Sequence, residues 1–598
     1  MALSWIDWTV LTATLLTIVG YGTWVTRNNK TVQDYIKGGN STKWWTIGLS
    51  VMATQASAIT FLSTTGQAFS DGMGFVQFYF GLPIAMVIIC LVFIPLYHRL
   101  KVFTAYEFLE DRFDLKTRSL TAILFLIQRG LAAGITIFAP AIILSIVLGI
   151  KVVYLNIIIG VLVIIYTVSG GTKAVTVTQK QQMFVIFAGM LAALFITLQL
   201  IPDEVSFTDA IEIAGANGRM EVLDFSFDLE NRYTVWSGLI GGTFLALSYF
   251  GTDQSQVQRY LSGKSMKEMQ MGLIFNGLLK VPMQFFILLV GIMVFVFYQF
   301  NPAPLNFIDA STEKVLASEY ASEYRALQEK QTILFNEKKS ISLQLAKNEN
   351  TDLKLQVSKL DSIEKTYRLE SKFLIKKAID TAYTSKYNAL VSEVESLKSN
   401  PDSELYISKS DELEELYKSA AKDTRTNDRD YMFIRFILNH LPKGLIGLLL
   451  AVILSAAMSS TASEINALAT ITSIDLYGRN LKIKKNEAGM VKVTKWFTLL
   501  WGIVAIIIAC FANLAENLIQ LVNIIGSIFY GNVLGIFLLA FFFKYIKGNA
   551  VFTGAIITQA IIIIGWWYDW MPYLWLNLFG CVLVIIITHI VQGFQSKK

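Results

Sequence analysis

The strongest constraint in this sequence is a series of apolar runs, each long enough to cross a lipid bilayer as a helix. A crossing takes roughly 20 consecutive apolar residues. Thirteen such runs are centred near residues 16, 55, 86, 133, 161, 191, 245, 285, 460, 503, 532, 558 and 583, although twelve or fourteen also fit. The chain is 54% hydrophobic, too apolar for soluble domains. We therefore predict an all-α polytopic membrane protein with about 13 transmembrane helices.

The residues that most often build catalytic centres form no such pattern here. The three cysteines all fall inside apolar runs, where small buried packing residues are expected, and the three histidines are scattered. The apolar runs contain neither H-E-x-x-H nor G-x-S-x-G. We therefore predict a protein that is not an enzyme. The first run lacks a basic leader and a small-residue cleavage site, so we expect it to be a retained helix.

Lysine and arginine are unevenly distributed between alternate loops. They gather at 27–43, 99–118, 173–180, 259–267, 479–495, 544–547 and 597–598, whereas the opposite short loops hold few. Short cytoplasmic loops retain basic residues. We therefore predict a multi-pass protein of the cell membrane with its N-terminus outside and its C-terminus in the cytoplasm. The net charge of +6 is then mostly a topology signal, and no nucleic-acid partner is expected.

One long segment, residues 305–430, departs from the membrane pattern. It is rich in Lys, Glu, Ser and Asn, and apolar residues recur in it every three or four positions. That spacing predicts amphipathic helices, with a hairpin broken near Asn348 to Thr351. By the predicted topology this helical insertion is extracytoplasmic. It is either an elaboration of one loop or a docking platform for an outer protein partner.

Two apolar runs are interrupted by polar residues. The second run carries Ser, Thr and Gly in its middle, and the seventh turns polar at GTDQSQ. Inside a bilayer such interruptions require surrounding protein or a water-filled site. Each of these runs stands first in a block of five, and paired interrupted helices in two halves are typical of inverted-repeat transporters with a binding site at the midplane.

This pattern divides the chain into seven segments. A first helix and its loop (1–43) precede the first repeat (44–201) and an extracytoplasmic loop (202–232). The second repeat is split by the insertion (305–430) into 233–304 and 431–545, and 546–598 adds C-terminal helices.

The stretch SAAMSSTASE, residues 455–464, places hydroxyl-bearing side chains inside an apolar run. Ala456, Ser459 and Ser460 lie at i, i+3 and i+4 and therefore share one helical face. If the second run unwinds near Ala53 to Ala56, its carbonyls and these two hydroxyls are suitable ligands for a small monovalent cation. Serine in a membrane helix also serves as a contact between helices or bonds back to the i−4 carbonyl.

Several of these segments together resemble the sodium/solute symporters, a family of carriers for sugars, sialic acid, monocarboxylates, iodide and vitamins. The resemblance lies in SVMATQASAITFLSTTGQ (50–67), TAYEFLEDRF (104–113), IFAPAIIL (137–144), YTVSGGTKAV (166–175), DQSQVQRYLSGKS (253–265) and SAAMSSTASEINALATITSIDLY (455–477). It covers most of the chain outside 305–430. It implies the LeuT-type five-plus-five inverted repeat and coupling of transport to Na⁺.

The same resemblance implies a sodium site. It is formed by the carbonyls of Ala53, Ala56 and Ala456 with the hydroxyls of Ser459 and Ser460. An additional sodium site in some members uses an Asp where this chain has Gln179, so the sodium stoichiometry stays open. Glu464 stands where the related carriers have a small polar residue. It is expected to partner a cation, bind a second Na⁺ or lie in the inner vestibule.

Two ionisable residues lie deep inside apolar runs, where such residues are functional candidates. Arg129 resembles a sialic-acid-binding Arg, and guanidinium suits carboxylate recognition. Lys280 resembles a Lys at the substrate site of sugar carriers. Ser57 and Thr60 resemble hydroxyl contacts to the solute, and Tyr249 resembles an inner aromatic gate. Arg129 could also snorkel or pair with Glu464, Lys280 could line the inner vestibule, and Tyr249 could be packing.

We therefore predict a sodium-coupled symporter that imports a small organic solute, favouring an organic anion, by alternating access. A sodium/sugar or polyol symporter is one alternative. A transporter-like sensor that uses the outer insertion is another. The predicted partners are Na⁺, the solute and the lipid bilayer.

Overall fold

The computed structural model describes residues 3–26, 31–228, 231–348, 350–399, 401–423, 425–479, 486–512 and 518–596. Within these ranges the regular structure is helical, apart from one isolated bridge between Thr42 and Gly263. The basic residues at 27–30, 480–485 and 597–598, which contributed to the predicted orientation, lie outside the described residues.

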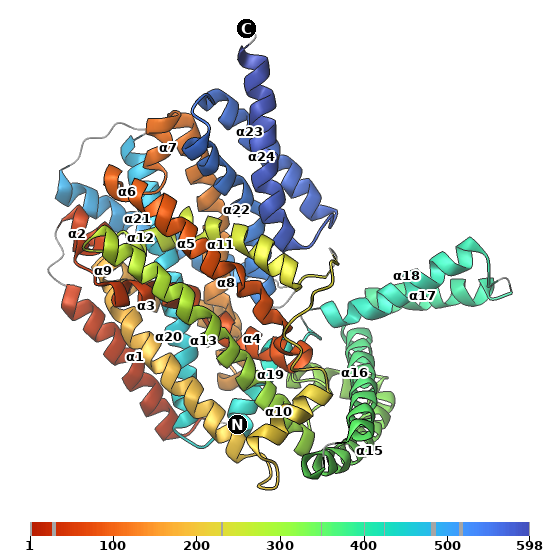
Figure 1. Cartoon of the computed structure of the whole chain (residues 1–598). Coiled ribbons are helices and arrows are strands. Elements are labelled where there is room, and N and C mark those ends of the chain that lie inside the picture. The colour runs from red at the N-terminus through yellow and green to blue at the C-terminus, as the bar shows by residue number, and fades with distance from the viewer. Residues whose placement is uncertain are drawn as a thin grey trace.

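Apolar helices long enough to cross a membrane make up most of the bundle (Figure 1). Ten candidate spans are found among the described residues. They comprise α1 (Trp5–Thr26), α4 (Ala58–Asp71) continuing through α5 (Gly81–Ile88) and α6 (Ile94–Leu100), α8 (Leu115–Leu148), α9 (Val152–Gln199), α13 (Met266–Phe300), α20 (Leu445–Ile471), α21 (Glu487–Phe511), α22 (Leu518–Phe542), α23 (Gly548–Trp567) and α24 (Tyr573–Ser596).

The difference between ten spans and the predicted thirteen has a structural origin. The runs centred at 161 and 191 are two helices that join directly at a kink at Gly171, whose backbone is not helical, and together they count as the one element α9. The runs centred at 55 and 245 are each interrupted. The first consists of α3 (Trp44–Gln55) and α4, and the second of α11 (Gly242–Gly251) and α12 (Gln254–Tyr260). The number thirteen and the inverted repeat therefore stay predictions.

The interruption of the second run occurs at Ala56 and Ser57, next to the predicted position. The backbone of Ala56 has φ −86° and ψ 77°, outside the helical region. Carbonyl groups in the last turn of a helix have no donor four residues later. The end of α3 therefore presents carbonyl oxygens to the interior of the protein.

Helix α20 is the central element of the bundle and packs against α8, α9, α1 and α3. Every residue from Leu449 to Ile471 is buried, including the hydroxyl-bearing ones. A helix buried on all sides is expected to be apolar on all sides. The polar residues of α20 therefore need partners on the neighbouring helices.

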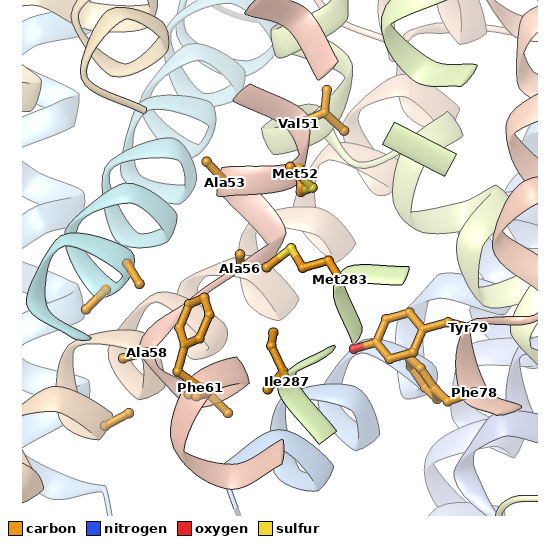
Figure 2. Close-up of a cluster of buried hydrophobic side chains, with 14 of the residues drawn as sticks. Val51, Met52, Ala53, Ala56, Ala58, Phe61, Phe78, Tyr79, Met283 and Ile287 are labelled. Atoms are coloured by element: carbon orange, nitrogen blue, oxygen red, sulfur yellow. The ribbon is translucent and has the colours of Figure 1, made fainter. Parts of the chain in front are cut away.

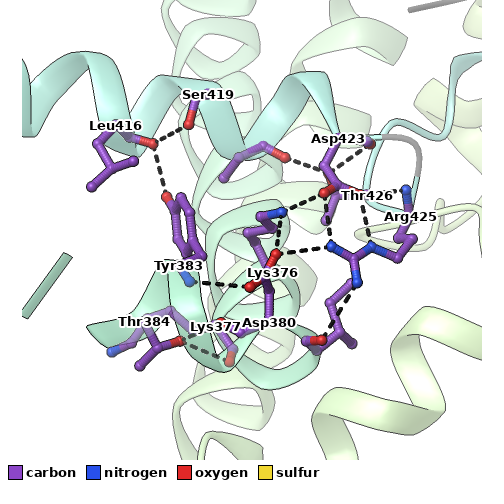
Figure 3. A network of polar contacts seen from close by, with 12 residues as sticks. Lys376, Lys377, Asp380, Tyr383, Thr384, Leu416, Ser419, Asp423, Arg425 and Thr426 are labelled. Carbon is purple, nitrogen blue, oxygen red and sulfur yellow. Dashed lines mark hydrogen bonds and ion pairs between the residues drawn. The ribbon is translucent and has the colours of Figure 1, made fainter. Parts of the chain in front are cut away.

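The insertion is a set of helices at one end of the bundle (Figure 1). Its hairpin of α15 (Ala321–Lys347) and α16 (Thr351–Ile379) breaks where the sequence predicted. A second hairpin, α17 (Thr381–Leu397) and α18 (Glu404–Ser419), projects away from the body. At its base, Asp380 and Asp423 accept hydrogen bonds from Lys376 and Arg425 (Figure 3). The shorter α14 (Asp309–Leu316) and α19 (Arg429–His440) flank the insertion.

The chain ends lie at opposite ends of the bundle (Figure 1). Asp7 near the N-terminus accepts hydrogen bonds from the backbone of Gly444 (2.6 Å) and Gly447 (3.0 Å), at the start of α20. The insertion lies at this same end, and the C-terminal end of α24 lies at the other. The relative sides agree with the predicted topology, whereas the membrane face of each end stays a prediction.

Candidate functional site

A cavity lies beside both interrupted helices, at the middle of α20. Its lining combines hydroxyl and amide groups, aromatic rings and two opposite charges. It is lined by Thr54, Gln55, Ser57, Ile59, Thr60, Phe78, Tyr79, Arg129, Thr136, Leu245, Tyr249, Ser460, Glu464, Val522, Asn523 and Tyr530. Four of the five predicted solute-contacting residues, all except Lys280, therefore line one cavity.

The predicted sodium ligands meet where α3 ends against α20. The hydroxyl of Ser459 donates a hydrogen bond to the carbonyl of Ala53 at 3.1 Å. The hydroxyl of Ser460 donates to the carbonyl of Ala456 at 3.4 Å, the back-bonded geometry expected of serine in a helix. Ala53, Ala56 and Phe61 follow the interrupted helix in Figure 2, with Met283 and Ile287 from α13 nearby.

The donor set of this place fits Na⁺. It offers neutral hydroxyl and carbonyl oxygens, which are hard ligands, and its side chains are nearly fully buried. The hydroxyl of Ser459 donates its hydrogen to the carbonyl of Ala53, and both of these oxygens are predicted ligands of the cation. A bound cation would replace this hydrogen bond by two oxygen–cation contacts.

Gln179 of α9 also contacts the Ser459 hydroxyl. Its amide nitrogen lies within hydrogen-bonding distance of three hydroxyl oxygens, those of Ser459 (3.0 Å), Ser463 (3.0 Å) and Thr54 (2.9 Å). Its amide oxygen accepts from Ser50. An uncharged N–H group thus occupies the centre of a cluster of hydroxyls. A carboxylate at this position would place a negative charge there instead.

Arg129 of α8 lies between two carboxylates. Its guanidinium donates to Glu464 of α20 at 3.0 Å, and it also pairs with Asp253, which lies between α11 and α12. The second oxygen of Glu464 accepts from Thr136 at 2.9 Å, and Asp253 accepts from Tyr530 at 3.1 Å. All three charged side chains are buried. The predicted alternative of a pair between Arg129 and Glu464 is therefore what the structure contains.

Counted with both carboxylates ionised, this network carries one more negative than positive charge. Arg129 contributes one cation against the two carboxylates of Asp253 and Glu464. Burying an uncompensated charge costs several kcal/mol, so a network of this sign favours an additional cation nearby. The predicted sodium site lies about one helical turn away, because Ser460 and Glu464 are four residues apart on α20.

Three further predicted residues have defined surroundings. Tyr249 accepts a hydrogen bond from Gln256 at 2.7 Å, and its ring lies 5.3 Å from the Arg129 guanidinium. Thr60 donates to the carbonyl of Gln55 at 3.3 Å. Lys280 is fully buried, and its ammonium has no hydrogen-bond partner among the described residues. It lies 5.8 Å from the centre of the Tyr79 ring, which lines the cavity.

Asp253, Tyr530 and Thr136 belong to the site although the sequence did not single them out. Asp253 is an ionisable residue in the polar turn that interrupts the seventh run, and this feature could have marked it. Tyr530 and Thr136 are ordinary residues of apolar helices, and only their contacts to Asp253 and Glu464 identify them.

The chain matches the family model described as the sodium:solute symporter family over residues 35–324 and 416–558. Among curated proteins, it is 31% identical to a human sodium/iodide cotransporter over 299 residues, which cover 49% of this chain and 45% of that one. It is 29% identical to a sodium/glucose cotransporter of Vibrio parahaemolyticus over 304 residues, covering 49% of this chain and 56% of the relative. The matched segments thus span about half the length of these relatives.

Among solved structures, a substrate-bound, outward-open Na⁺-coupled sialic acid symporter has a similar fold. The TM-score is 0.72 at 20% sequence identity, and the alignment covers 99% of this chain and 98% of that one. This similarity extends the fold assignment to nearly the whole chain, whereas the family model leaves out residues 325–415 of the insertion.

Proposed function

Because this chain belongs to the sodium:solute symporter family, we propose that it is a Na⁺-coupled symporter that imports a small organic solute. The observation that carries the proposal is the contact between the Ala53 carbonyl and the Ser459 hydroxyl at the interruption of the second run. Neutral oxygens from the end of α3 and from the middle of α20 are the ligands a buried Na⁺ requires. In this proposal the end with the insertion faces outside, as the distribution of basic residues predicts.

Coupling follows from the position of this sodium site. A cation bound there holds the end of α3 against α20 and with it one wall of the cavity. Na⁺ binding therefore favours the arrangement that receives the solute, and its release inside lets both leave. Differential affinity of Na⁺ for the two arrangements is what drives the change.

The solute proposed from the sequence is an organic anion, with Arg129 as the group that receives its carboxylate. In the structure this guanidinium already pairs with Asp253 and Glu464. An anion would therefore have to displace one carboxylate, or bind together with a second cation. The aromatic rings and hydroxyls around the cavity supply the remaining contacts.

A neutral sugar or polyol is the second candidate, and the charge of the network favours it. One bound Na⁺ neutralises the excess negative charge of Arg129, Asp253 and Glu464. A neutral polar solute then leaves the loaded site without net charge. The two relatives named above transport iodide and glucose by their names, so similarity alone does not choose between these classes.

The test is uptake into proteoliposomes that contain the full-length protein. A panel of labelled carboxylates and sugars is offered with an inward Na⁺ gradient or with K⁺ in its place. We expect uptake of at least one solute to require Na⁺. Ser459→Ala and Ser460→Ala should each raise the half-saturating Na⁺ concentration at least tenfold, because each removes a hydroxyl ligand.

Ser455→Ala is the matched control. Ser455 is a buried serine of the same helix, one turn before the predicted ligands. Its substitution should leave the Na⁺ requirement unchanged. Uptake that proceeds equally without Na⁺, in the unmodified protein, would refute the proposed function.

A further inference from the structure

A second cavity lies at the insertion end of the bundle, where the outer end of α4 meets the insertion. It has a volume of about 260 Å³ and is bordered by the ends of α4, α13 and α19 and by α16 of the insertion. Phe69 of α4 is nine residues from Thr60, which lines the central cavity. At a rise of 1.5 Å per residue the two cavities are therefore about 14 Å apart along α4.

Aromatic side chains form one wall of this outer cavity. Phe69 makes edge contacts with Phe295, Tyr298 and Phe307, with ring centres 5.6–6.0 Å apart. The guanidinium of Arg368 lies 5.7 Å from the Phe69 ring and 5.4 Å from the Phe307 ring. The wall is therefore a rigid apolar surface with a cation held against it.

The charges around the cavity are not balanced. Five cationic side chains and four carboxylates line it, and each of the five cations forms an ion pair with one of these carboxylates. Two cations share Asp361, and Lys338, which is not part of the lining, pairs with Asp361 and Glu364 as well. The lining cations are Arg219, Lys365, Arg368, Lys372 and Arg429; the lining carboxylates are Asp71, Asp361, Glu364 and Asp428. The excess of positive over negative side chains produces a positive electrostatic potential, which attracts anions from the surrounding solution.

One buried polar atom in the cavity has no partner. Gln299 of α13 lines the cavity and is 3% exposed, and its amide nitrogen donates to the carbonyl of Phe295 at 3.1 Å. Its amide oxygen accepts no hydrogen bond among the described residues. A buried acceptor without a donor costs about 1–3 kcal/mol, which a ligand with an O–H or N–H group would recover.

We infer that this outer cavity is a binding site for small carboxylates that also carry a hydroxyl or amide donor. The positive excess receives the carboxylate, the oxygen of Gln299 accepts from the donor, and the aromatic wall covers the carbon skeleton. The site is formed partly by residues 325–415, which the family model does not match, so it would be a property added by the insertion. It would collect anions above the central cavity.

Binding is tested on the purified full-length protein in a buffer with K⁺ and no Na⁺. The probe is labelled gluconate, a hydroxylated carboxylate, with glucose and acetate as competitors. We expect saturable gluconate binding that acetate displaces weakly and glucose hardly at all. The same binding should persist in Ser459→Ala, which separates this site from the proposed sodium site.

Two variants test whether the gluconate probe binds in the outer cavity. Lys365→Ala should weaken gluconate binding roughly twofold to fivefold, the size expected for one partly exposed charge. Gln299→Leu should abolish the preference for gluconate over acetate, because the unpaired acceptor is removed. Lys386→Ala is the control, since its side chain on α17 is 62% exposed against 56% for Lys365 and carries the same charge.

The outcomes are distinct. Absence of saturable binding would overturn the inference, as would equal weakening by Lys365→Ala and Lys386→Ala, which indicates a general charge effect. Thermal unfolding of each variant is measured to check that the fold is retained. In proteoliposomes, a raised half-saturating solute concentration at unchanged maximal rate in Lys365→Ala indicates that the transported solute itself visits the cavity. Unchanged uptake indicates that another anion does.

Discussion

At the scale of single residues, the position of Arg129 decides the charge of the central site. Its guanidinium joins α8 to α20 through Glu464 and to the second interrupted helix through Asp253. Ring and hydroxyl groups of Tyr249 and Tyr530 complete its surroundings. Arg129 therefore holds α8, α20 and the turn between α11 and α12 together.

Arg129→Gln should destabilise the protein strongly, by about 3–5 kcal/mol, because two carboxylates are left buried without a cation. Asp253→Asn added to this variant should restore part of the stability, since the network returns to one excess negative charge. Thermal unfolding in detergent measures both. A double variant less stable than Arg129→Gln would contradict this account of the charges.

Glu464→Gln removes a negative charge from the same network, whereas Arg129→Gln removes the positive one. It leaves Arg129 and Asp253 as a neutral pair, so an anionic solute should bind more tightly than in the unmodified protein. Binding of a neutral sugar should change little. Competition of carboxylates and sugars for uptake, compared between the two proteins, separates the two candidate solute classes.

Gln179 determines how the hydroxyls beside the sodium site are arranged. Gln179→Ala removes the donor shared by Ser459, Ser463 and Thr54, so these hydroxyls are free to reorient. We expect a change of several-fold in the half-saturating Na⁺ concentration, with solute selectivity unchanged, measured by Na⁺ titration of uptake. Selectivity that shifts while Na⁺ dependence stays constant would place Gln179 in the solute site instead.

At the scale of elements, one glycine forms the kink at which two predicted spans join directly within α9. Gly171 of α9 has φ +57° and ψ −147°, a conformation that residues with a Cβ rarely adopt. A Cβ at this position would lie 2.4 Å from the carbonyl oxygen of Tyr35. The bend thus depends on the absence of a side chain.

Gly171→Ala should therefore lower stability by about 1–3 kcal/mol, the cost of a strained backbone conformation. Thermal unfolding measures the loss. Gly149→Ala is a useful comparison, because Gly149 has a similar φ of +65° but no atom within 4 Å of its would-be Cβ. A smaller loss is expected in Gly149→Ala, because Gly149 has the ordinary left-handed ψ of 18° and no crowding, whereas Gly171 combines ψ −147° with a close contact. Equal losses in the two variants would contradict this account.

At the scale of the whole molecule, ion pairs join α15 to α16 within the insertion and attach the insertion to the bundle. Lys338 bridges Asp361 and Glu364 on α16, and Arg219 from the bundle side pairs with Asp361 at 3.3 Å. Burial alone would raise the pKa of Glu364, but Lys338 and Arg368 outweigh it and lower the pKa to about 2. The pKa of Asp361 is lowered by Lys338 and Arg219 against the effect of burial.

The folded insertion therefore becomes less stable in acid. Because the folded pKa of Glu364 lies below its unfolded value of about 4.3, the stabilisation is complete above roughly pH 5 and is lost as the pH falls towards 2. The protection factors for hydrogen exchange in residues 351–379, which are corrected for the intrinsic exchange rate at each pH, should fall over that range. Glu364→Gln should have lower protection factors at neutral pH, and these should depend less on pH. Glu393→Gln, on the hairpin of α17 and α18, should behave like the unmodified protein.

The amino-acid sequence alone determined the class of this protein. The length of an apolar run and its interruption by polar residues are local properties of the sequence. The runs predicted membrane helices, the hydroxyls of Ser459 and Ser460 predicted a cation site, and the period of residues 305–430 predicted a helical hairpin. The contacts of Arg129, Asp253 and Gln179 were decided by tertiary structure. Arg129 and Glu464 are 335 residues apart, and Gln179 and Ser459 are 280 apart. Pairings over such distances depend on how the helices pack, and so does the cavity between the insertion and α4.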